Sequence, residues 1–193
     1  MSVVYGCDPG LKNCAFVKLV TNQNSFSIEK MEIVDISDGM DNFYTFFKKY
    51  MLEEGDTYIE YQYRQGRTKD MSHHIHGYLT AMMNKRIYLK QSRDKFKVAI
   101  ELGIMPKDHG DLKIYKNRKK CSESIMQTIL TKLEDPHLNI NSAKKDDLAD
   151  ALLYALWAIR ERCPSSLTGI NTVEGAIEKM KPLKEEKRIR ITV

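Results

Sequence analysis

The sequence predicts an α/β protein built on a mixed five-stranded sheet with flanking helices, in which an antiparallel three-strand meander joins parallel strands. Two observations lead to this prediction. The first 35 residues contain three short strand-like patterns separated by turn residues, which is typical of a meander. A helical stripe then precedes a fourth strand-like segment, and a strand, helix, strand order is most simply a right-handed crossover to a parallel strand.

The composition is that of one globular domain. The chain has 193 residues, of which 42% are hydrophobic and 30% charged, values that are ordinary for a soluble protein with its own core. No apolar run reaches the roughly 18 residues of a membrane span, and the N-terminus lacks a signal-peptide pattern. The sequence therefore predicts a protein without a membrane partner.

Four cysteines are present, and none belongs to a C-x-x-C pair: Cys7, Cys14, Cys121 and Cys163. Zinc sites and redox motifs usually show closely spaced pairs. We therefore expect reduced, partly buried thiols in an intracellular protein, in preference to a zinc site or a disulfide.

The first predicted strand ends on a carboxylate. Residues 3–8 are β-branched and aromatic up to Asp8, and the Pro9-Gly10 pair then favours a turn. Asp8 is thus expected at the end of a central strand. A carboxylate in that position is costly unless it is exposed, hydrogen-bonded or bound to a cation.

The next elements complete the meander and lead to a second strand-end carboxylate. Residues 14–20 and 26–35 predict the second and third strands. Asp38 is a candidate cap for a helix that continues to residue 51 and ends at Gly55. Residues 57–60 predict a strand ending on Glu60, which the parallel topology places on a strand next to that of Asp8.

A polar, aromatic and basic segment, residues 61–67, follows and is typical of a loop that contacts nucleic acid. Residues 68–84 predict a helix with a methionine-rich apolar side. Its histidines, His73, His74 and His76, resemble a metal cluster, but no nearby carboxylate or cysteine completes a zinc pattern. Packing or contact with a DNA backbone accounts for them better.

The second half of the chain is basic and then helical. Residues 86–89 predict the fifth strand, and the segment up to Lys120 is expected to be loop-rich. Ser122 is a candidate cap for a helix through residue 130. The last predicted helix, over residues 143–159, is apolar on nearly every side and is therefore expected to pack on the sheet. Pro164 ends it.

The basic charge is concentrated. The net charge is +5, yet residues 85–120 carry twelve Lys or Arg against four Asp or Glu, and the end of the chain from Lys179 holds six basic residues against two acidic ones. Such blocks favour polyanions, because each neutralised phosphate releases counterions. A solvated basic face explains the same pattern equally well, so charge alone does not decide the function.

The last helix begins with three aspartates. Asp147 and Asp150 are three residues apart and Asp146 and Asp150 four apart, so either pair shares a helix face. The helix dipole explains an acidic residue in the first turn, but Asp150 lies among apolar residues and needs another explanation. Together with Asp8 and Glu60, these carboxylates would repel one another unless cations such as Mg²⁺ or Mn²⁺ joined them.

Three motifs in order give the chain a resemblance to a known family. A strand ending G-C-D-P-G, the segment Y-I-E-Y-Q and a helix opening K-K-D-D-L-A-D-A-L resemble RuvC-type Holliday junction resolvases, which have an RNase H-like fold. The poxvirus branch of this family is similar in chain length and in the sequence segment E-Y-Q-Y-R. The resemblance covers residues 1–162.

The resemblance implies the site and its metal. Its catalytic, metal-binding carboxylates would be Asp8, Glu60, Asp147 and Asp150, where the spacing D-x-x-D-A selects Asp147 over Asp146. Two Mg²⁺ ions per active site, with Mn²⁺ as a substitute, would drive phosphodiester hydrolysis. Lys119, with Lys120 beside it, would stabilise the charge of the phosphate.

The resemblance also implies the biological setting. A homodimer would make paired incisions across branched DNA, namely four-way junctions of a viral genome, in the cytoplasm of an infected cell. Residues 1–163 would form the resolvase domain and residues 164–193 a basic C-terminal extension. The methionine-rich helix is a candidate dimer interface, although simple core packing explains its stripe at least as well. The alternatives are another RNase H-like nuclease, acting on other branched DNA or RNA–DNA hybrids, and a non-catalytic junction-binding protein.

Overall fold

The structure is a computed structural model. The residues it describes are 1–50, 54–61, 67–83, 86–106, 108, 110–135 and 144–170.

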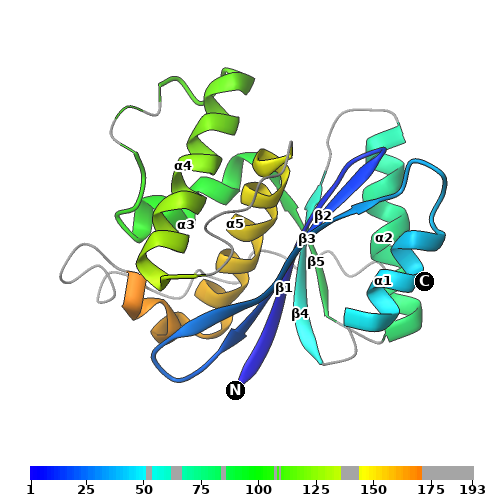
Figure 1. Ribbon diagram of the computed structural model, residues 1–193, viewed down its shortest axis with the longest axis horizontal. Coiled ribbons are helices and arrows are strands. Elements are labelled where there is room, and N and C mark those ends of the chain that lie inside the picture. Colours follow the sequence, from blue (N-terminus) through cyan, green and yellow to red (C-terminus); the bar gives the residue numbers. More distant parts are fainter. Residues whose placement is uncertain are drawn as a thin grey trace.

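A mixed five-stranded sheet lies at the centre of the molecule (Figure 1), in the order β3-β2-β1-β4-β5. Its strands are β1 (Ser2–Pro9), β2 (Asn13–Thr21), β3 (Phe26–Asp35), β4 (Gly55–Tyr61) and β5 (Ile87–Gln91). β1, β2 and β3 form an antiparallel meander, whereas β4 pairs in parallel with β1 on one side and β5 on the other. The predicted fold class, including its meander and parallel strands, is confirmed.

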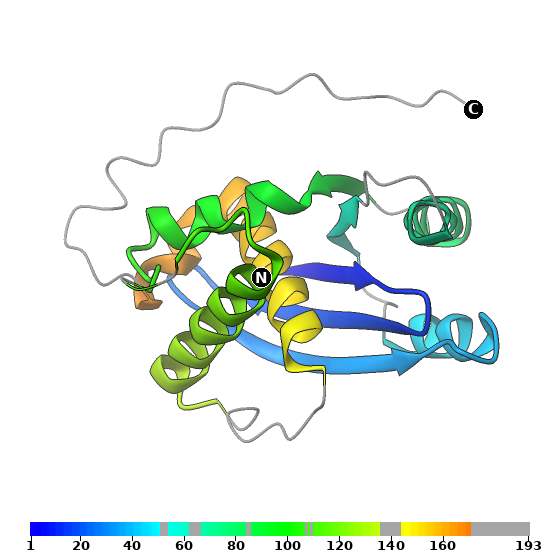
Figure 2. The same cartoon turned by 90° about the horizontal axis from the view of Figure 1, so that it is seen from above.

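Helices cover both faces of the sheet, as Figures 1 and 2 show. α1 (Asp41–Tyr50) and α2 (Arg67–Met83) lie on one face, where Phe16, Phe43, Phe47 and Leu79 are buried in one apolar cluster. α3 (Lys95–Glu101), α4 (Tyr115–Leu133) and α5 (Lys145–Arg162) cover the other face around a larger cluster. None of the described helices is long and apolar enough to cross a membrane.

α5 is the central helix of the second layer, and it packs directly on β1. Every residue from Leu148 to Ile159 is buried, as the all-round apolar pattern predicts. Gly6 permits this close approach, because a Cβ at that position would lie 1.9 Å from the Ala151 carbonyl oxygen. The first turns of α5 are therefore held beside the end of β1.

Four expectations from the sequence differ from the structure. α1 begins at Asp41 rather than after Asp38, and Gly55 opens β4 instead of ending the preceding helix. The segment expected to be loop-rich contains η1 (Ser92–Asp94) and α3. α4 begins at Tyr115, so Ser122 is a buried residue within the helix and not its cap. Lysine and arginine are good helix formers, and the basic run 116–120 supports a helix within the segment that was expected to be loop-rich.

The chain continues past α5 into a short 3-10 helix, η3 (Pro164–Ile170), after the predicted break at Pro164. Leu167 is fully buried in the larger apolar cluster, and Ser166 Oγ donates a hydrogen bond to the Asn22 carbonyl oxygen. η3 therefore packs on the sheet near the turn between β2 and β3. The rest of the predicted extension, residues 171–193, lies outside the described residues.

Candidate metal centre

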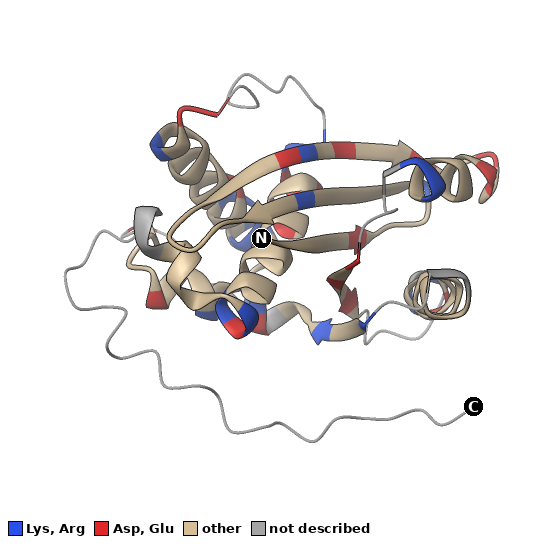
Figure 3. Ribbon diagram, turned by 90° about the horizontal axis from the view of Figure 1, so that it is seen from below, with Lys and Arg blue, Asp and Glu red and all other residues tan. Residues whose placement is uncertain are grey.

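Three carboxylates meet where β1, β4 and α5 come together. Asp8, Glu60 and Asp150 each offer an oxygen atom within 4.8 Å of the others, and they form the group of potential metal ligands found among the described residues. Glu60 is 6% and Asp150 8% exposed, and Asp8 is partly buried. Figure 3 shows acidic residues at the ends of the central strands and basic residues on the flanking helices.

The topology explains this convergence. In the parallel pairing of β1 with β4, Cys7 is the partner of Ile59, so Asp8 and Glu60 follow at the same end of neighbouring strands. Asp150 precedes Ala151, whose carbonyl contacts Gly6 on β1. Two strand ends and one helix turn thus fix the three carboxylates on regular backbone. This confirms the predicted neighbourhood of Asp8 and Glu60.

The cluster carries more negative charge than its protein partners balance. Burial, together with Glu60 and Asp150, raises the pKa of Asp8 well above its usual value. Tyr154 donates its hydroxyl to Glu60 Oε2 at 3.1 Å. Asp150 Oδ1 is buried and has no hydrogen-bond partner among the described residues. A buried carboxylate oxygen without a hydrogen-bond partner destabilises the folded protein. Such an oxygen is expected where a bound cation completes the site.

Lys95, at the start of α3, also enters this cluster. Its Nζ lies 2.5 Å from Asp150 Oδ2 and 3.8 Å from Glu60 Oε2, and its side chain is 5% exposed. Burial alone would lower the pKa of Lys95, but Asp150 and Glu60 outweigh burial and raise the pKa above its usual value. Lys95 belongs to no motif and is one of twelve basic residues between positions 85 and 120, so nothing in the sequence distinguishes it as part of the site.

Asp147 and Lys119 lie together beside the three-carboxylate cluster. Lys119 Nζ is 3.2 Å from Asp147 Oδ1 and also forms an ion pair with Asp146. Both aspartates and the lysine are partly exposed. Burial would lower the pKa of Lys119, but its contacts with Tyr115 and Asp147 raise it. The structure thus brings together Asp8, Glu60 and Asp150, while Asp147 lies one turn earlier on α5 beside Lys119, and Asp146 lies nearer to that lysine than Asp147 does.

The donor set fits a hard divalent cation. All three clustered ligands are carboxylates, which Mg²⁺ and Mn²⁺ prefer to nitrogen or sulfur. The unpartnered Asp150 Oδ1 and the surplus of negative charge both point to a missing positive charge. The histidines of α2 do not supply a comparable group within the described residues. His74 Nε2 instead lies 2.7 Å from the Tyr44 hydroxyl, and His73 packs edge-on against Tyr61.

A basic and partly apolar surface adjoins the site at the N-terminal end of α4. Ile114 and Tyr115 are exposed, and Lys113 and Lys116 flank them. The Tyr115 ring lies 5.0 Å from Lys119 Nζ, which links this surface to Asp147. A polyanion bound here would reach the carboxylates from a positively charged side.

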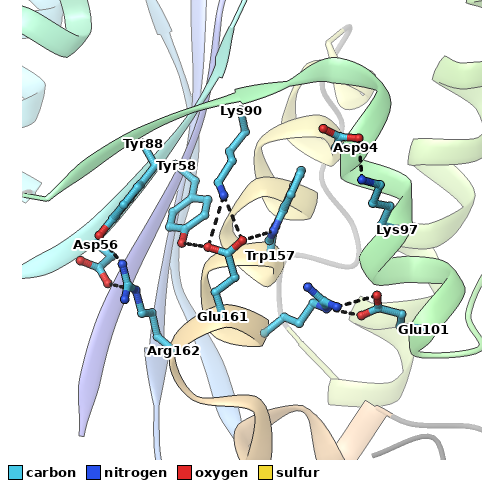
Figure 4. Close-up of polar contacts among 11 residues, drawn as sticks. Asp56, Tyr58, Tyr88, Lys90, Asp94, Lys97, Glu101, Trp157, Glu161 and Arg162 are labelled. Atoms are coloured by element: carbon cyan, nitrogen blue, oxygen red, sulfur yellow. Dashed lines mark hydrogen bonds and ion pairs between the residues drawn. The ribbon is translucent and has the colours of Figure 1, made fainter. Parts of the chain in front are cut away.

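A second polar cluster occupies the other end of α5 (Figure 4). Glu161 accepts hydrogen bonds from Lys90 Nζ at 2.9 Å, from Trp157 Nε1 at 2.7 Å and from the Tyr58 hydroxyl. Beside it, Asp56 forms ion pairs with Arg86 and Arg162, each at 2.7 Å. In this network, which connects β4, β5 and α5, each carboxylate forms an ion pair with at least one basic side chain.

Comparisons with known proteins agree with this geometry. The family model of the poxvirus A22 protein matches residues 2–161. A crystal structure of the fowlpox virus Holliday junction resolvase matches with a TM-score of 0.59 at 15% identity, over 81% of this chain and 96% of that one. The same resolvase with substrate Holliday junction DNA matches with a TM-score of 0.56 at 19% identity, over 80% and 95%. At these identities the likeness establishes the shared RNase H-like fold. No curated protein matches the chain by sequence.

Proposed function

The chain belongs to the poxvirus A22 protein family, and we propose that it is a Holliday junction resolvase: a metal-dependent endonuclease that makes paired, symmetric incisions in four-way DNA. One observation carries this proposal, namely the buried cluster of Asp8, Glu60 and Asp150 at the ends of β1, β4 and α5. The fold shared with the fowlpox virus enzyme, whose complex with junction DNA is known, supports branched DNA as the substrate class.

Asp8, Glu60 and Asp150 would hold Mg²⁺, with Asp147 as the fourth carboxylate of a site for two ions and Mn²⁺ as a substitute. Bound ions would supply an activated water and stabilise the leaving oxygen of an in-line displacement at phosphorus. The strand ends and the first turns of α5 fix the ligands before substrate arrives. The incisions would leave 5′-phosphate and 3′-hydroxyl ends.

Lys119 would stabilise the charge on the scissile phosphate. Its ammonium group lies at the edge of the site, beside Asp147 and below the exposed surface that begins with Ile114 and Tyr115. Lys120, the neighbouring residue, is exposed and makes no described contact with the carboxylates. These positions support Lys119 over Lys120 for the role.

The twofold symmetry of a four-way junction leads us to infer a homodimer with two active sites. The methionine-rich helix, α2, remains the candidate interface. Its described apolar residues contribute largely to the core, since Ile75 and Leu79 are fully buried and Met71 and Tyr78 pack against the same cluster. Sedimentation at micromolar concentration, with and without junction DNA, tests the dimer, and a monomer in both conditions would contradict it.

The family also supports a place of action and a division of the chain. We infer that the protein acts in the cytoplasm of the infected cell, on branched or concatemeric viral DNA. Residues 1–163 would form the resolvase domain, and the basic extension from residue 164 would add to DNA binding through its positive charge. Removal of residues 171–193 should then weaken binding more at low salt than at high salt.

Cleavage of a labelled, immobile four-way junction tests the proposal, with cuts mapped on all four strands in Mg²⁺ and in EDTA. Symmetric, ligatable nicks on opposing strands that vanish in EDTA are expected. Preference for a flap or an RNA–DNA hybrid, or asymmetric cutting, would instead indicate another RNase H-like nuclease. Tight binding without incision in Mg²⁺ or Mn²⁺ would indicate a non-catalytic junction-binding protein.

A further inference from the structure

We propose that Lys95 is a resident counter-ion of the carboxylate cluster, and that a divalent ion enters the site by displacing its ammonium group. Lys95 would thereby stabilise the folded protein in the absence of metal, and it would raise the metal concentration that the enzyme requires. This inference rests on the proposed function, because it concerns the metal site of that function.

The position of the ammonium group carries the inference. Lys95 Nζ lies 2.5 Å from Asp150 Oδ2 and 3.8 Å from Glu60 Oε2, two of the three clustered ligand residues. The lysine side chain is 5% exposed, so water does little to screen these contacts. Without the lysine, the buried carboxylates of Glu60 and Asp150 would lie beside that of Asp8 with one positive charge fewer to offset them.

The backbone that carries Lys95 is fixed. α3 follows β5 through the single turn of η1, and Phe96, Val98 and Ala99 are buried in the larger apolar cluster. The Cα of Lys95 therefore stays beside α5, whereas its four-carbon stem is flexible. Displacement of the ammonium group requires only rotation of the side chain.

The ammonium group and a metal ion would share one carboxylate, because Lys95 pairs with Asp150 Oδ2 while Asp150 Oδ1 is the unpartnered oxygen. Mg²⁺ binds carboxylate oxygens at about 2.0–2.1 Å and tolerates little distortion. An ammonium group hydrogen-bonded to Asp150 Oδ2 has no lone pair to offer a metal and repels a second positive charge. Because two positive charges on one buried carboxylate repel each other, metal binding includes the work of moving the Lys95 ammonium group away.

Lys97 provides a matched control on the same helix. It pairs with Asp94 Oδ1 at 3.0 Å (Figure 4), and its side chain is 55% exposed, whereas that of Lys95 is 5% exposed. Lys97→Met removes the same charge two residues from Lys95 without touching the cluster.

Calorimetric titration with Mn²⁺, and thermal unfolding in EDTA and in Mg²⁺, test the inference on the full chain. Lys95→Met should bind Mn²⁺ about tenfold more tightly than the wild type. It should also unfold at a lower temperature in EDTA and gain more from Mg²⁺ than the wild type does. Lys97→Met should match the wild type in both measurements.

Three outcomes would overturn the inference. If the wild type binds Mn²⁺ and Lys95→Met binds it equally or more weakly, the role of Lys95 is contradicted while the proposed function stands. If neither the wild type nor the variants bind Mn²⁺, both the role of Lys95 and the proposed metal-dependent function are contradicted.

Because Lys95→Met removes a buried charge, a measurement on the wild type keeps the test independent of folding. The ¹⁵Nζ resonance of Lys95 should shift saturably as Mg²⁺ is added, while that of Lys97 stays in place. An unchanged Lys95 resonance in a protein that binds Mg²⁺ would be the third contradicting outcome.

Discussion

Two charged clusters lie on the same helix, about three turns apart, and they differ in how their charges are balanced. At the C-terminal end of α5, Glu161 receives three donors and Asp56 faces two arginines. Near the N-terminal end, Asp150 meets two further carboxylates and one lysine, and one of its oxygens has no described partner. A cluster that only stabilises the fold matches its charges, so the unmatched one points to a ligand.

The pKa directions express the same difference. Burial would raise the pKa of Glu161, but the hydrogen bonds from Tyr58 and Lys90 outweigh it and lower the pKa below its usual value. Burial and neighbouring carboxylates raise the pKa of Asp8. The protein itself thus favours the charged form of Glu161, whereas the surroundings of Asp8 disfavour its charged form, which a bound cation would favour.

The largest expected effect separates the two clusters by activity. Asp150→Asn should reduce junction cleavage by about 10³-fold or more, because it removes a metal ligand, while binding of the junction is retained. Glu161→Gln is the matched control on the same helix and should cleave within about threefold of the wild type. Single-turnover cleavage with saturating enzyme measures both. Near-normal cleavage by Asp150→Asn would contradict the assignment of a catalytic role to this cluster alone.

The edge of the site should contribute less than its centre. Lys119→Met is expected to slow cleavage by about 10²-fold, as loss of one charge-stabilising group does. Lys120→Met removes an exposed neighbouring charge and should change only salt-dependent binding. Cleavage rates and binding at two salt concentrations distinguish these roles. A larger loss of cleavage for Lys120→Met would transfer the assignment to Lys120.

Stability should respond in opposite directions at the two clusters. Glu161→Gln should lower the free energy of unfolding by about 1–3 kcal/mol, because it weakens charge-assisted hydrogen bonds. Asp8→Asn should raise the stability of the metal-free protein, since it removes a carboxylate whose charged form is disfavoured by burial and by Glu60 and Asp150. Chemical denaturation in EDTA measures both variants. A loss of stability in Asp8→Asn would show that its charge is already balanced.

The smallest effect is the pH dependence of the Glu161 network. Because the folded-state pKa of Glu161 is lowered from 4.5, its contribution to stability is fully present above pH 4.5 and is lost as the pH falls through the folded-state pKa. The difference in unfolding free energy between the wild type and Glu161→Gln should therefore be constant near neutral pH and shrink in acid. A difference that grows below pH 4.5 would contradict the assigned direction.

The sequence predicted those parts of the molecule that depend on short-range pattern. Asp8 and Glu60 each end a strand-like run, and a parallel crossover was enough to place them side by side. Asp150 was identified because a carboxylate stood among apolar residues of a buried helix. These features are local, and the topology that joins them follows a general rule of handedness.

Lys95 could not be found in the same way. Its burial results from α3 packing beside α5, and α3 itself lies in a segment that was expected to be loop-rich. The choice between Asp146 and Asp147 was also beyond helix geometry, and Lys119 contacts both in the structure. Both questions depend on contacts between elements far apart in the chain, which periodicity does not encode.

The most direct test of the account is the location of bound metal. A crystal of the protein soaked in Mn²⁺ should show an anomalous scattering peak among Asp8, Glu60 and Asp150, with the ammonium group of Lys95 moved off Asp150. No peak is expected at Glu161 or Asp56, whose charges are already matched. A Mn²⁺-soaked crystal without a peak at the three carboxylates would contradict the central claim that this cluster is a metal site.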